Sequence, residues 1–300
     1  MNAGPSVYAR VTQQIVDELE RGVAPWVKPW SGAGGSPLLP YNATSHHRYQ
    51  GVNVLLLWQA SQEKGYQSPA WITFRQAKGL GGYVKRGERA TDIVYASTFV
   101  PKAEREKGDE EEPKRVPILK WLAVFNVEQT EGLPEDVCPK PQPGVLAEAL
   151  EAVDAFLKAI GAEVRHGGDR AYYSPALDVI QLPNPGDFES SAHYYATSLH
   201  EHSHWTGHES RLHRELGGRF GDEAYAAEEL VAELSAAFLC AALAIPGQLR
   251  HVEYLGAWLK LMKQDSHAIF SMAARATEAA RYLEVRGGRE PMPEDAEATA

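Results

Sequence analysis

LHEHSHWTGH, residues 199–208, is the stretch that decides the fold of the second half of this sequence. His200 and His204 stand four residues apart in it, and Glu201 follows the first histidine, which gives the pattern HExxH. Positions four apart share one face of a helix, so both imidazoles can ligate one metal ion. Glu201 projects beside that face and is predicted to act as the general base on a water that the metal activates. The alternative is a histidine-rich helix end whose imidazoles face solvent or cap carbonyl groups.

The helix after this motif is expected to supply a third ligand, because a catalytic zinc has three protein ligands and one open position. Its sequence YAAEELVAELSAAF (225–238) places acidic side chains at the edge of an apolar face, where carboxylates are costly unless they meet a cation. We predict Glu229 as the ligand and Glu233 as the acceptor that orients a ligand histidine. The alternative is an acidic helix face in solvent.

His208 is a rival for the third metal position. Zincins that use three histidines place the last one where Ser210 stands here, so the sequence favours Glu229. His208 and Tyr225 are instead candidate donors to an oxyanion. His202 has the wrong helical phase for the metal and is expected to face solvent. The metal itself is predicted to be zinc, with another divalent ion such as Mn²⁺ as the alternative.

The composition is that of an ordinary globular protein, with 44% apolar and 23% charged residues. With two cysteines and no apolar run near the roughly 20 residues that cross a bilayer, neither a disulfide framework nor a membrane partner is expected. The first residues lack a signal-peptide core, so the expected location is the cytoplasm. The proline-rich stretch GLPEDVCPKPQPG (132–144) predicts an interdomain linker.

These features predict an α+β fold in two domains. The expected bounds are 1–130 for an α+β domain, 131–145 for the linker, 146–286 for a mainly α domain with a small β-sheet, and 287–300 for a disordered tail. Hydrophobic periodicity and turn signals predict helices over 7–21, 54–63, 74–80, 144–159, 187–207, 222–244 and 251–285, and strands over 92–100, 116–127, 171–173 and 179–182. Ser6 and Asp187 are the predicted caps of the first and fifth helices.

Aromatic and basic residues cluster in the first domain, in PWVKPW (25–30), HRY (47–49), WITFR (71–75) and GGYVKRG (81–87). Single-stranded nucleic acid is commonly held by aromatic rings that stack on bases and by cations that contact phosphates. Residues 1–100 hold ten Lys/Arg against six Asp/Glu, whereas residues 131–300 hold fourteen against twenty-seven, so only the first domain attracts a polyanion. The alternative for each aromatic residue is a place in the core. The candidate DNA-binding residues are Trp26, Lys28, Trp30, Arg48, Tyr49, Asn53, Trp71, Phe74, Arg75, Lys85 and Arg86.

Longer motifs give a family resemblance that spans nearly the whole chain. The motifs are PWVKPW, YQGVNVLLL, WITFRQAKGLGGYVKRGERA and FNVEQTEGL in the first domain, and DVIQLP, YYATSLHEHSHWTGH, SRLHR and AEELVAELSAAFL in the second. They resemble the ArdC-type antirestriction proteins of conjugative plasmids, which are related to the primase-associated TraC proteins. The resemblance implies a first domain that binds single-stranded DNA and a second domain of the zincin-like metallopeptidase class.

The resemblance also implies a function, namely protection of incoming plasmid DNA from host restriction during conjugation. Any protein substrate would then be sought among the host's restriction components. The family assigns the metal and base roles to His200, His204, Glu201 and the acids of AEELVAE. The alternative is a DNA-shielding protein whose zincin domain is structural or proteolytically inactive. A metal-dependent nuclease is a third hypothesis, which a single HExxH with one water-activating acid supports less well than peptide hydrolysis.

Overall fold

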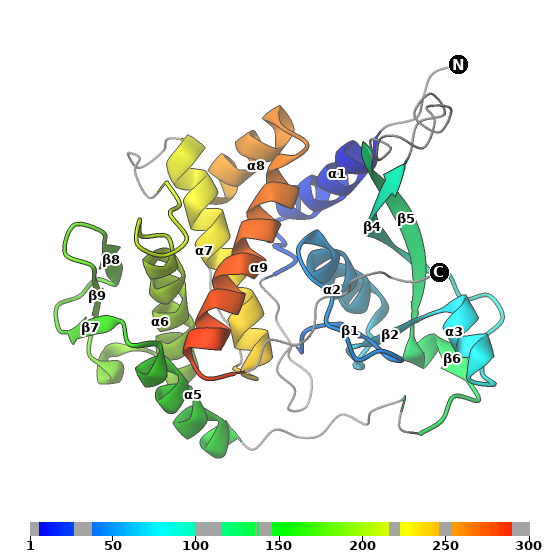
Figure 1. The fold of residues 1–300 in the computed structure, drawn as a ribbon, viewed down its shortest axis with the longest axis horizontal. Helices are drawn as coiled ribbons and strands as arrows, with labels where there is room; N and C mark the ends of the chain where they lie inside the picture. Colours follow the sequence, from blue (N-terminus) through cyan, green and yellow to red (C-terminus); the bar gives the residue numbers. More distant parts are fainter. Residues whose placement is uncertain are drawn as a thin grey trace, which may run out of the picture.

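The structure is a computed structural model and describes residues 6–26, 38–99, 116–135, 137, 146–215, 223–245 and 254–289. Helices and two larger sheets build an α+β fold, with the helices of the second half gathered on one side and the long strands on the other (Figure 1). Among these residues no helix combines the length and the apolar character that crossing a membrane requires. The predicted domain bounds remain a prediction, and most of the linker lies outside the described residues.

A four-stranded sheet forms the frame of the first half, in the order β1-β2-β5-β4. The long strands β4 (Thr91–Phe99) and β5 (Val116–Asn126) pair antiparallel, which confirms the pair of strands predicted from their β-branched and aromatic residues. The short strands β2 (Ala70–Thr73) and β1 (Tyr41–Asn42) complete the sheet, with β2 antiparallel to β5 and β1 parallel to β2.

Three helices accompany this sheet. Helix α1 (Val7–Glu20) begins where the Ser6 hydroxyl accepts a hydrogen bond from the backbone N–H of Ala9, as the sequence predicted. Helix α2 (Val52–Lys64) is buried along most of its length and ends at Gly65, whose φ of 74° is a left-handed conformation that favours glycine. Helix α3 (Phe74–Gly79) is short and starts with a capping box.

A small ribbon follows α3, in which β3 (Tyr83–Val84) pairs antiparallel with β6 (Thr130–Glu131). The turn η1 (Val127–Gln129) leads from β5 into β6. Strands of two residues carry no periodic signal, so neither β3 nor β6 was predicted from the sequence. The ribbon nevertheless fixes the loop after α3 against the end of β5.

The second half begins with α5 (Leu146–Ile160) and a three-stranded sheet in the order β7-β9-β8. Strand β9 (Val179–Leu182) lies between β7 (Glu163–His166), which is parallel to it, and β8 (Tyr172–Ser174), which is antiparallel. The sequence predicted β8 and β9 but not β7. The turn η2 (Pro185–Asp187) then leads toward the motif helix.

Four helices complete the second half: α6 (Ser191–Thr206), α7 (Glu223–Ala242), α8 (Leu255–Gln264) and α9 (Ala268–Arg286). The predicted cap of α6 was wrong, because Asp187 belongs to η2 and the Ser190 hydroxyl accepts from the N–H of His193. The single helix predicted over 251–285 was also wrong. It breaks at Ser266, whose carbonyl oxygen is left to accept a 2.7 Å hydrogen bond from the Thr12 hydroxyl of α1.

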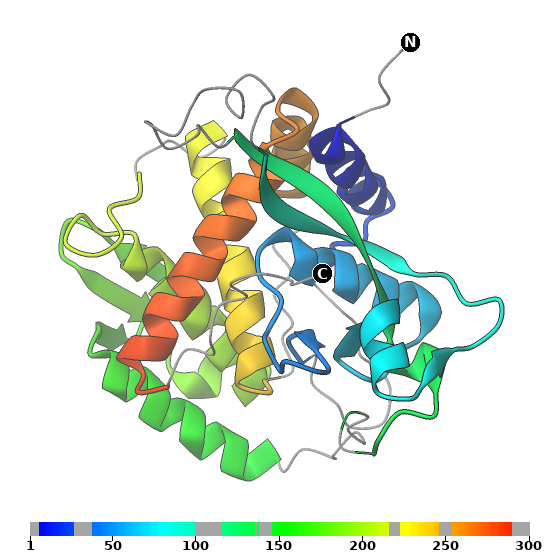
Figure 2. The same ribbon diagram turned by 45° about the vertical axis from the view of Figure 1, so that its right-hand side comes forward.

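One buried apolar cluster runs through both halves. Helix α1 packs on α8, and α2 packs on α9 (Figure 2). Side chains from the two halves therefore share one core. Ile15 and Leu55 from the first half lie in it with Leu199, Leu234 and Leu283 from the second. A smaller cluster lies under α3 and β2. The α6–α7 pair therefore packs against a core that excludes water.

Candidate metal centre

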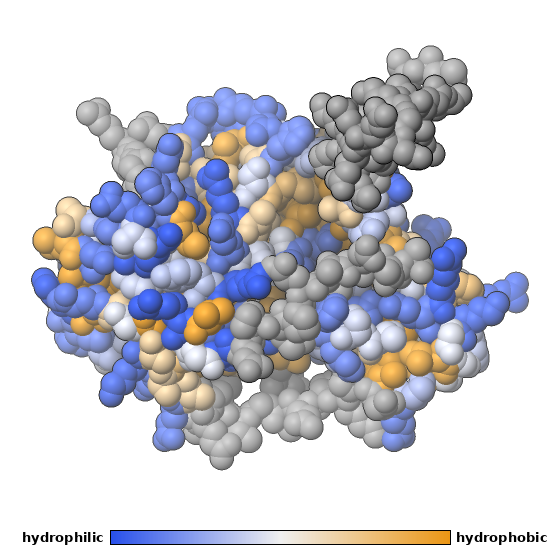
Figure 3. Space-filling model, in the orientation of Figure 1, coloured by the Kyte–Doolittle hydropathy of each residue, from blue (hydrophilic) through white to orange (hydrophobic). Residues whose placement is uncertain are grey.

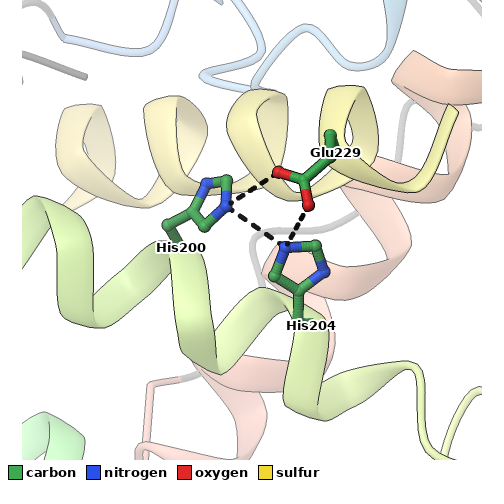
Figure 4. Close-up of side chains that lie close together, drawn as sticks. All are labelled: His200, His204 and Glu229. Atoms are coloured by element: carbon green, nitrogen blue, oxygen red, sulfur yellow. Dashed lines mark hydrogen bonds and ion pairs between the residues drawn. The ribbon is translucent and has the colours of Figure 1, made fainter. Parts of the chain in front are cut away.

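His200 and His204 project from α6 toward Glu229 on the neighbouring helix α7 (Figure 4). The two Nε2 atoms lie 3.2 Å apart. Glu229 places Oε2 at 3.5 Å from Nε2 of His200 and Oε1 at 3.6 Å from Nε2 of His204. The helical spacing of four residues and the adjacent carboxylate thus bring three ligand atoms to one point, as the sequence predicted for these three residues.

These spacings fit a small divalent cation. Tetrahedral zinc with bonds of about 2.0–2.2 Å to nitrogen and oxygen separates its ligand atoms by roughly 3.3–3.5 Å. The three donor atoms of His200, His204 and Glu229 all lie within 4.8 Å of one another. Two neutral imidazoles and a carboxylate are also a donor set that zinc and other divalent transition metals accept. The residues present therefore fit the group that the motif implies.

The Nδ1 atoms of both histidines face carboxylates from α7. Nδ1 of His200 lies 3.6 Å from Oε2 of Glu233, and Nδ1 of His204 lies 3.2 Å from Oε1 of Glu228. A carboxylate at Nδ1 favours the tautomer that keeps its hydrogen there, so the lone pair of Nε2 points at the cluster. Glu233 thus stands where an orienting acceptor was predicted, and Glu228 is a second one that the sequence did not single out.

Arg214 supports Glu228 from the other side. Its guanidinium donates to both carboxylate oxygens, at 3.0 and 2.8 Å, and also to the Ser203 carbonyl and the Thr206 hydroxyl. Arg214, Glu228 and His204 therefore form a continuous chain of polar contacts that ends at the cluster. The charge of Glu228 is balanced in a buried setting, where an unpaired carboxylate would be costly.

The electrostatics of the cluster favour positive charge. Burial disfavours the charged imidazole of His200, but the carboxylates of Glu229 and Glu233 outweigh it and raise the His200 pKa to about 10. Burial also opposes charge on His204, where Glu228 and Glu229 raise the pKa to about 9. Burial would raise the pKa of Glu229, yet its hydrogen bonds with the two histidines hold it well below its usual range. A cluster of groups that favours positive charge this strongly suits a cation.

The structure contradicts both alternatives in which the motif histidines or the acids of the next helix face solvent, and it contradicts the expected exposure of His202. His200 and the acids Glu228, Glu229 and Glu233 of α7 are buried, and the His204 side chain is only 13% exposed, so these groups do not face solvent. His202, which was expected to face solvent, is only 1% exposed and its Nδ1 lies 2.7 Å from the Ser198 carbonyl oxygen. Burial lowers the His202 pKa to about 4, which keeps the ring neutral. The helical phase keeps His202 out of the group His200, His204 and Glu229, but the expected exposure to solvent was wrong, because the opposite face of α6 also packs.

The candidate oxyanion donors lie in different settings. His208 turns toward Ser210, whose hydroxyl is 2.8 Å from Nδ1, and it does not join the cluster of three ligand atoms. The Tyr225 hydroxyl lies 3.2 Å from that of Tyr254 and also contacts Glu229. Burial, then the Tyr254 hydroxyl and Glu229, raises the Tyr225 pKa, so the phenol keeps its proton. Tyr225 is therefore the better placed donor of the two.

Burial also decides among the aromatic residues of the first half. Trp71 is fully buried, Trp26 packs edge-on against Trp258 of α8, and Tyr49 lies in the same core. A ring inside the core cannot stack on a base, so the structure argues against these three as DNA contacts. For these three residues the structure thus supports the alternative stated above, in which the aromatic side chain belongs to the hydrophobic core.

Two polar candidates also make hydrogen bonds or ion pairs within the molecule. The Asn53 side chain donates to the Val94 carbonyl and accepts from its N–H, which ties α2 to β4. Arg48 pairs with Glu284 of α9 at 3.0 Å, at the edge of a cavity of about 60 Å³ between the two halves. Asn53 and Arg48 therefore make contacts that hold the fold together.

The remaining candidates lie near α3 and β3. Phe74, Arg75 and Arg86 are exposed, whereas Lys85 is half-buried and donates to the Glu128 carbonyl oxygen at 2.9 Å. Lys28 and Trp30 lie outside the described residues. Of the candidate DNA-binding side chains that the structure describes, those free to meet a ligand thus come from one segment.

Comparison with known proteins identifies the family. Over 95% of its length the chain superimposes on 99% of the metal-free crystal structure of the antirestriction protein ArdC from plasmid R388, with 37% sequence identity and a TM-score of 0.80. This chain belongs to the ArdC antirestriction family. The Mn(II)-bound structure of the same ArdC protein also matches, with a TM-score of 0.77, 37% identity and coverage of 96% and 100% of the two chains.

Further comparisons agree with the ArdC assignment. Residues 5–125 match the N-terminal domain of anti-restriction factor ArdC, and residues 151–275 match a zincin-like metallopeptidase. The uncharacterized protein y4eC of Sinorhizobium fredii is 37% identical over 92% of this chain and 91% of its own length. DNA primase TraC of Escherichia coli is 39% identical over 92% of this chain, which corresponds to 27% of the primase.

Sequence reasoning missed three residues of this ArdC-family site. The sequence assigned no separate role to Glu228 among the acids of AEELVAE, because only side-chain geometry shows which acid of α7 meets Nδ1 of His204. Arg214 lies in the family motif SRLHR, which was the available signal, although nothing in the motif reveals its partner. Tyr254 reaches Tyr225 from 29 positions away and had no local signal.

Proposed function

We propose that this ArdC-family protein protects plasmid DNA from host restriction during conjugation, by binding the entering single strand and by cleaving a host protein with a divalent-metal peptidase centre. The convergence of two Nε2 atoms at 3.2 Å with the Glu229 carboxylate supports the metal centre. The family match supports the antirestriction role. The cytoplasm, where restriction enzymes meet entering DNA, is the matching location.

His200, His204 and Glu229 would hold the cation. We infer zinc, because two imidazoles and one carboxylate with an open position are the ligand set of zinc peptidases. Mn²⁺ is the alternative, since a solved ArdC relative carries Mn(II). The bound ion would supply Lewis acidity, which makes a water acidic near neutral pH and polarises a substrate carbonyl.

The chain's own groups divide the remaining tasks. Glu201, next to His200 on α6, accepts the proton from the attacking water and returns it to the leaving amine. Glu201 is buried, and its negative charge helps to raise the pKa of the neighbouring His200. The protonated Tyr225 hydroxyl donates a hydrogen bond to the oxygen that becomes negative during attack. Burial of the site keeps bulk water away from these exchanges.

A second candidate is a DNA-shielding protein whose zincin domain does not cleave protein. The observation that favours it is the closed setting of Glu201, which is only 7% exposed. In this case the cation would stabilise the α6–α7 pair, and protection would come from DNA binding alone.

Glu201→Gln separates the two functions. We expect the variant to retain the metal, because Glu201 is not among the three converging ligands, and to lose both cleavage of the host factor and antirestriction. Metal content, proteolysis in recipient extract and transfer into a restricting host would be measured side by side. Antirestriction that survives in a folded, metal-loaded variant would eliminate proteolysis as the mechanism. Labelled single strands incubated with the zinc-loaded protein should stay intact, and their cleavage would revive the nuclease hypothesis.

A further inference from the structure

The positive charge of the first hundred residues is concentrated in one short segment. Residues 74–89, FRQAKGLGGYVKRGER, hold five Lys/Arg and one Asp/Glu. The other residues of 1–100 hold five of each, so their net charge is zero. In a chain with a net charge of −10, this segment therefore carries the whole excess of +4 found in the first hundred residues. Such a concentration attracts a polyanion.

The same segment exposes two aromatic rings. Phe74 is 56% exposed and Tyr83 is 57% exposed, and burying such rings in water-free contact is favourable. Phe74 lies on α3 one turn from Lys78, and the chain then folds back, with the N–H of Gly82 on the Ala77 carbonyl at 2.9 Å. In Figure 3, apolar side chains gather at the end of the molecule that Figure 1 labels α3 and β6, with hydrophilic ones around them. We call the exposed side chains of residues 74–89 the α3–β3 surface.

The cations of this surface differ from the others nearby. Outside the segment, Arg10 stacks on Trp121, Arg21 pairs with Glu18, and Arg48 pairs with Glu284. Within the described part of the chain, no hydrogen bond or ion pair engages the charged groups of Arg75, Lys78 and Arg86. Their charges are therefore available to an external partner.

We propose that single-stranded DNA binds across the α3–β3 surface, with bases stacked on Phe74 and Tyr83 and phosphates contacted by Arg75, Lys78 and Arg86. This assignment rests on the proposed function, in which the ArdC-family protein binds single-stranded DNA, and it gives the place where the strand binds. It moves the interface away from Trp26, Tyr49 and Trp71, whose rings lie in the core. Tyr83, which lies in the GGYVKRG cluster, and Lys78, which lies between the clusters, were not among the candidate DNA-binding residues.

Exposed rings beside unpaired cations favour a single strand over a duplex. A single strand offers free base faces to Phe74 and Tyr83, whereas the base pairs of a duplex cover each other. The hydroxyl of Tyr83 donates to Oε2 of Glu131 at 2.5 Å, which steadies the ring in its exposed position. Gly82 lies so close to Glu131 and Leu133 that a side chain would not fit, so the loop beneath the ring is compact.

The test uses the full-length, metal-loaded protein and fluorescence anisotropy with a labelled oligo-dT strand and a duplex of equal length. We expect Phe74→Ala/Tyr83→Ala to weaken binding of the strand at least about tenfold, since each stacked base contributes measurably. Tyr83→Phe keeps the ring and should retain binding. We expect Arg75→Gln/Lys78→Gln/Arg86→Gln to lower the slope of log Kd against log salt by about 2, from roughly 0.7 per phosphate contact.

Control variants remove one exposed ring, or three positive charges, elsewhere in the molecule. Tyr172→Ala removes an exposed ring from the second half, and Lys158→Gln/Arg170→Gln/Arg275→Gln removes the same charge from exposed positions there. Both controls should bind like the wild type. Because all substituted side chains are exposed, the midpoint of thermal unfolding and the metal content should remain unchanged in every variant, which excludes unfolding as the cause.

The outcomes separate this inference from the proposed function. The assignment is supported if the wild type binds the strand and both α3–β3 variants bind it more weakly than their control variants do. If the wild type binds the strand but these variants match their controls, the interface lies elsewhere and the assignment is overturned, while DNA binding stands. If the wild type does not bind the strand, the DNA-binding part of the proposed function fails as well. Equal binding of strand and duplex would overturn the stacking model.

Discussion

Arg214 and Glu228 form a buried, two-point ion pair, and Glu228 continues it to Nδ1 of His204 at 3.2 Å. The arginine comes from the SRLHR motif just after α6, and the glutamate comes from α7. The pair thus links the segment that follows the HExxH helix to the helix that supplies the third ligand. A metal centre whose ligands come from two helices depends on such links for its geometry.

Arg214→Ala should therefore weaken metal binding without touching a ligand. Loss of the guanidinium leaves Glu228 without its partner, so His204 loses its fixed orientation, and affinity should fall by about 10–100-fold. Competition with a chromogenic chelator measures the change. Arg211→Ala is the control, because this buried arginine stacks on Trp205 and pairs with Asp178 without contacting the ligands. Equal losses in both variants would contradict the specific role of Arg214.

Glu229 and Glu233 should respond differently to substitution. Glu229→Ala removes one of the three converging ligands, so the purified protein should hold far less than one metal ion per chain. Glu233→Gln keeps an acceptor oxygen near Nδ1 of His200 and should retain the metal with lowered affinity. Elemental analysis of both variants beside the wild type provides the comparison. A full complement of metal in Glu229→Ala would show that another residue completes the centre.

Cys240 should be unreactive in the native protein. Burial, followed by the nearby charge of Glu233, raises the pKa of its thiol to about 12. At pH 8 only about 10⁻⁴ of such a thiol is thiolate, against roughly a quarter of an ordinary cysteine. A Cys138→Ser variant leaves Cys240 as the sole thiol, and DTNB should label it at pH 8 only after urea unfolds the chain. Rapid labelling of the folded variant would contradict this burial.

The same shift gives a pH dependence of stability with a defined sign. The folded pKa of Cys240 lies above the ordinary value of the unfolded chain, so the folded state holds the extra proton. Its contribution is complete below about pH 8.5 and is lost as pH rises toward 12, by up to about 1.4 kcal/mol per pH unit. Cys240→Ala should show a shallower loss of unfolding free energy over this range. An unchanged slope in urea titrations would refute the assignment.

Gly82→Ala and Gly79→Ala provide a matched test of the loop under the α3–β3 surface. A Cβ at Gly82 would lie 2.6 Å from Cδ2 of Leu133 and 2.9 Å from the Glu131 carbonyl oxygen, whereas one at Gly79 meets nothing within 4 Å. We expect Gly82→Ala to lower the unfolding free energy by about 1–3 kcal/mol. Gly79→Ala should be neutral or slightly stabilising. Equal urea midpoints for the two variants would show that the loop rearranges to accommodate the added methyl group.

The motif helix was the most predictable part of the molecule because its information is local. Four-residue spacing on one helix face places His200 and His204 together in any fold that keeps α6 helical. The approach of Glu229 followed from its position on the buried edge of the next helix. By contrast, the partners of Arg214 and Tyr225 depend on how α7 and α8 pack, which no spacing along the chain encodes.

The errors have equally physical causes. The aromatic clusters of the first half mixed buried and exposed rings, since Trp71 and Phe74 are only three positions apart but lie on opposite sides of the boundary between core and solvent. A strand followed directly by a helix produces this change of side, and the sequence did not predict strand β2. His202 was wrongly expected to face solvent, because α6 is buried on both faces. The usual pattern of one apolar and one exposed helix face does not predict this burial.

The shared core of α1, α2, α8 and α9 has a consequence for inheritance. Cutting the chain near the proline-rich linker would leave each fragment with an exposed apolar surface. Neither half could therefore be inherited as a separate protein without new mutations on that surface. Gene fusion is therefore expected to carry both halves together as one cassette. The match to 92% of this chain within little more than a quarter of TraC is the pattern that such joint transfer produces.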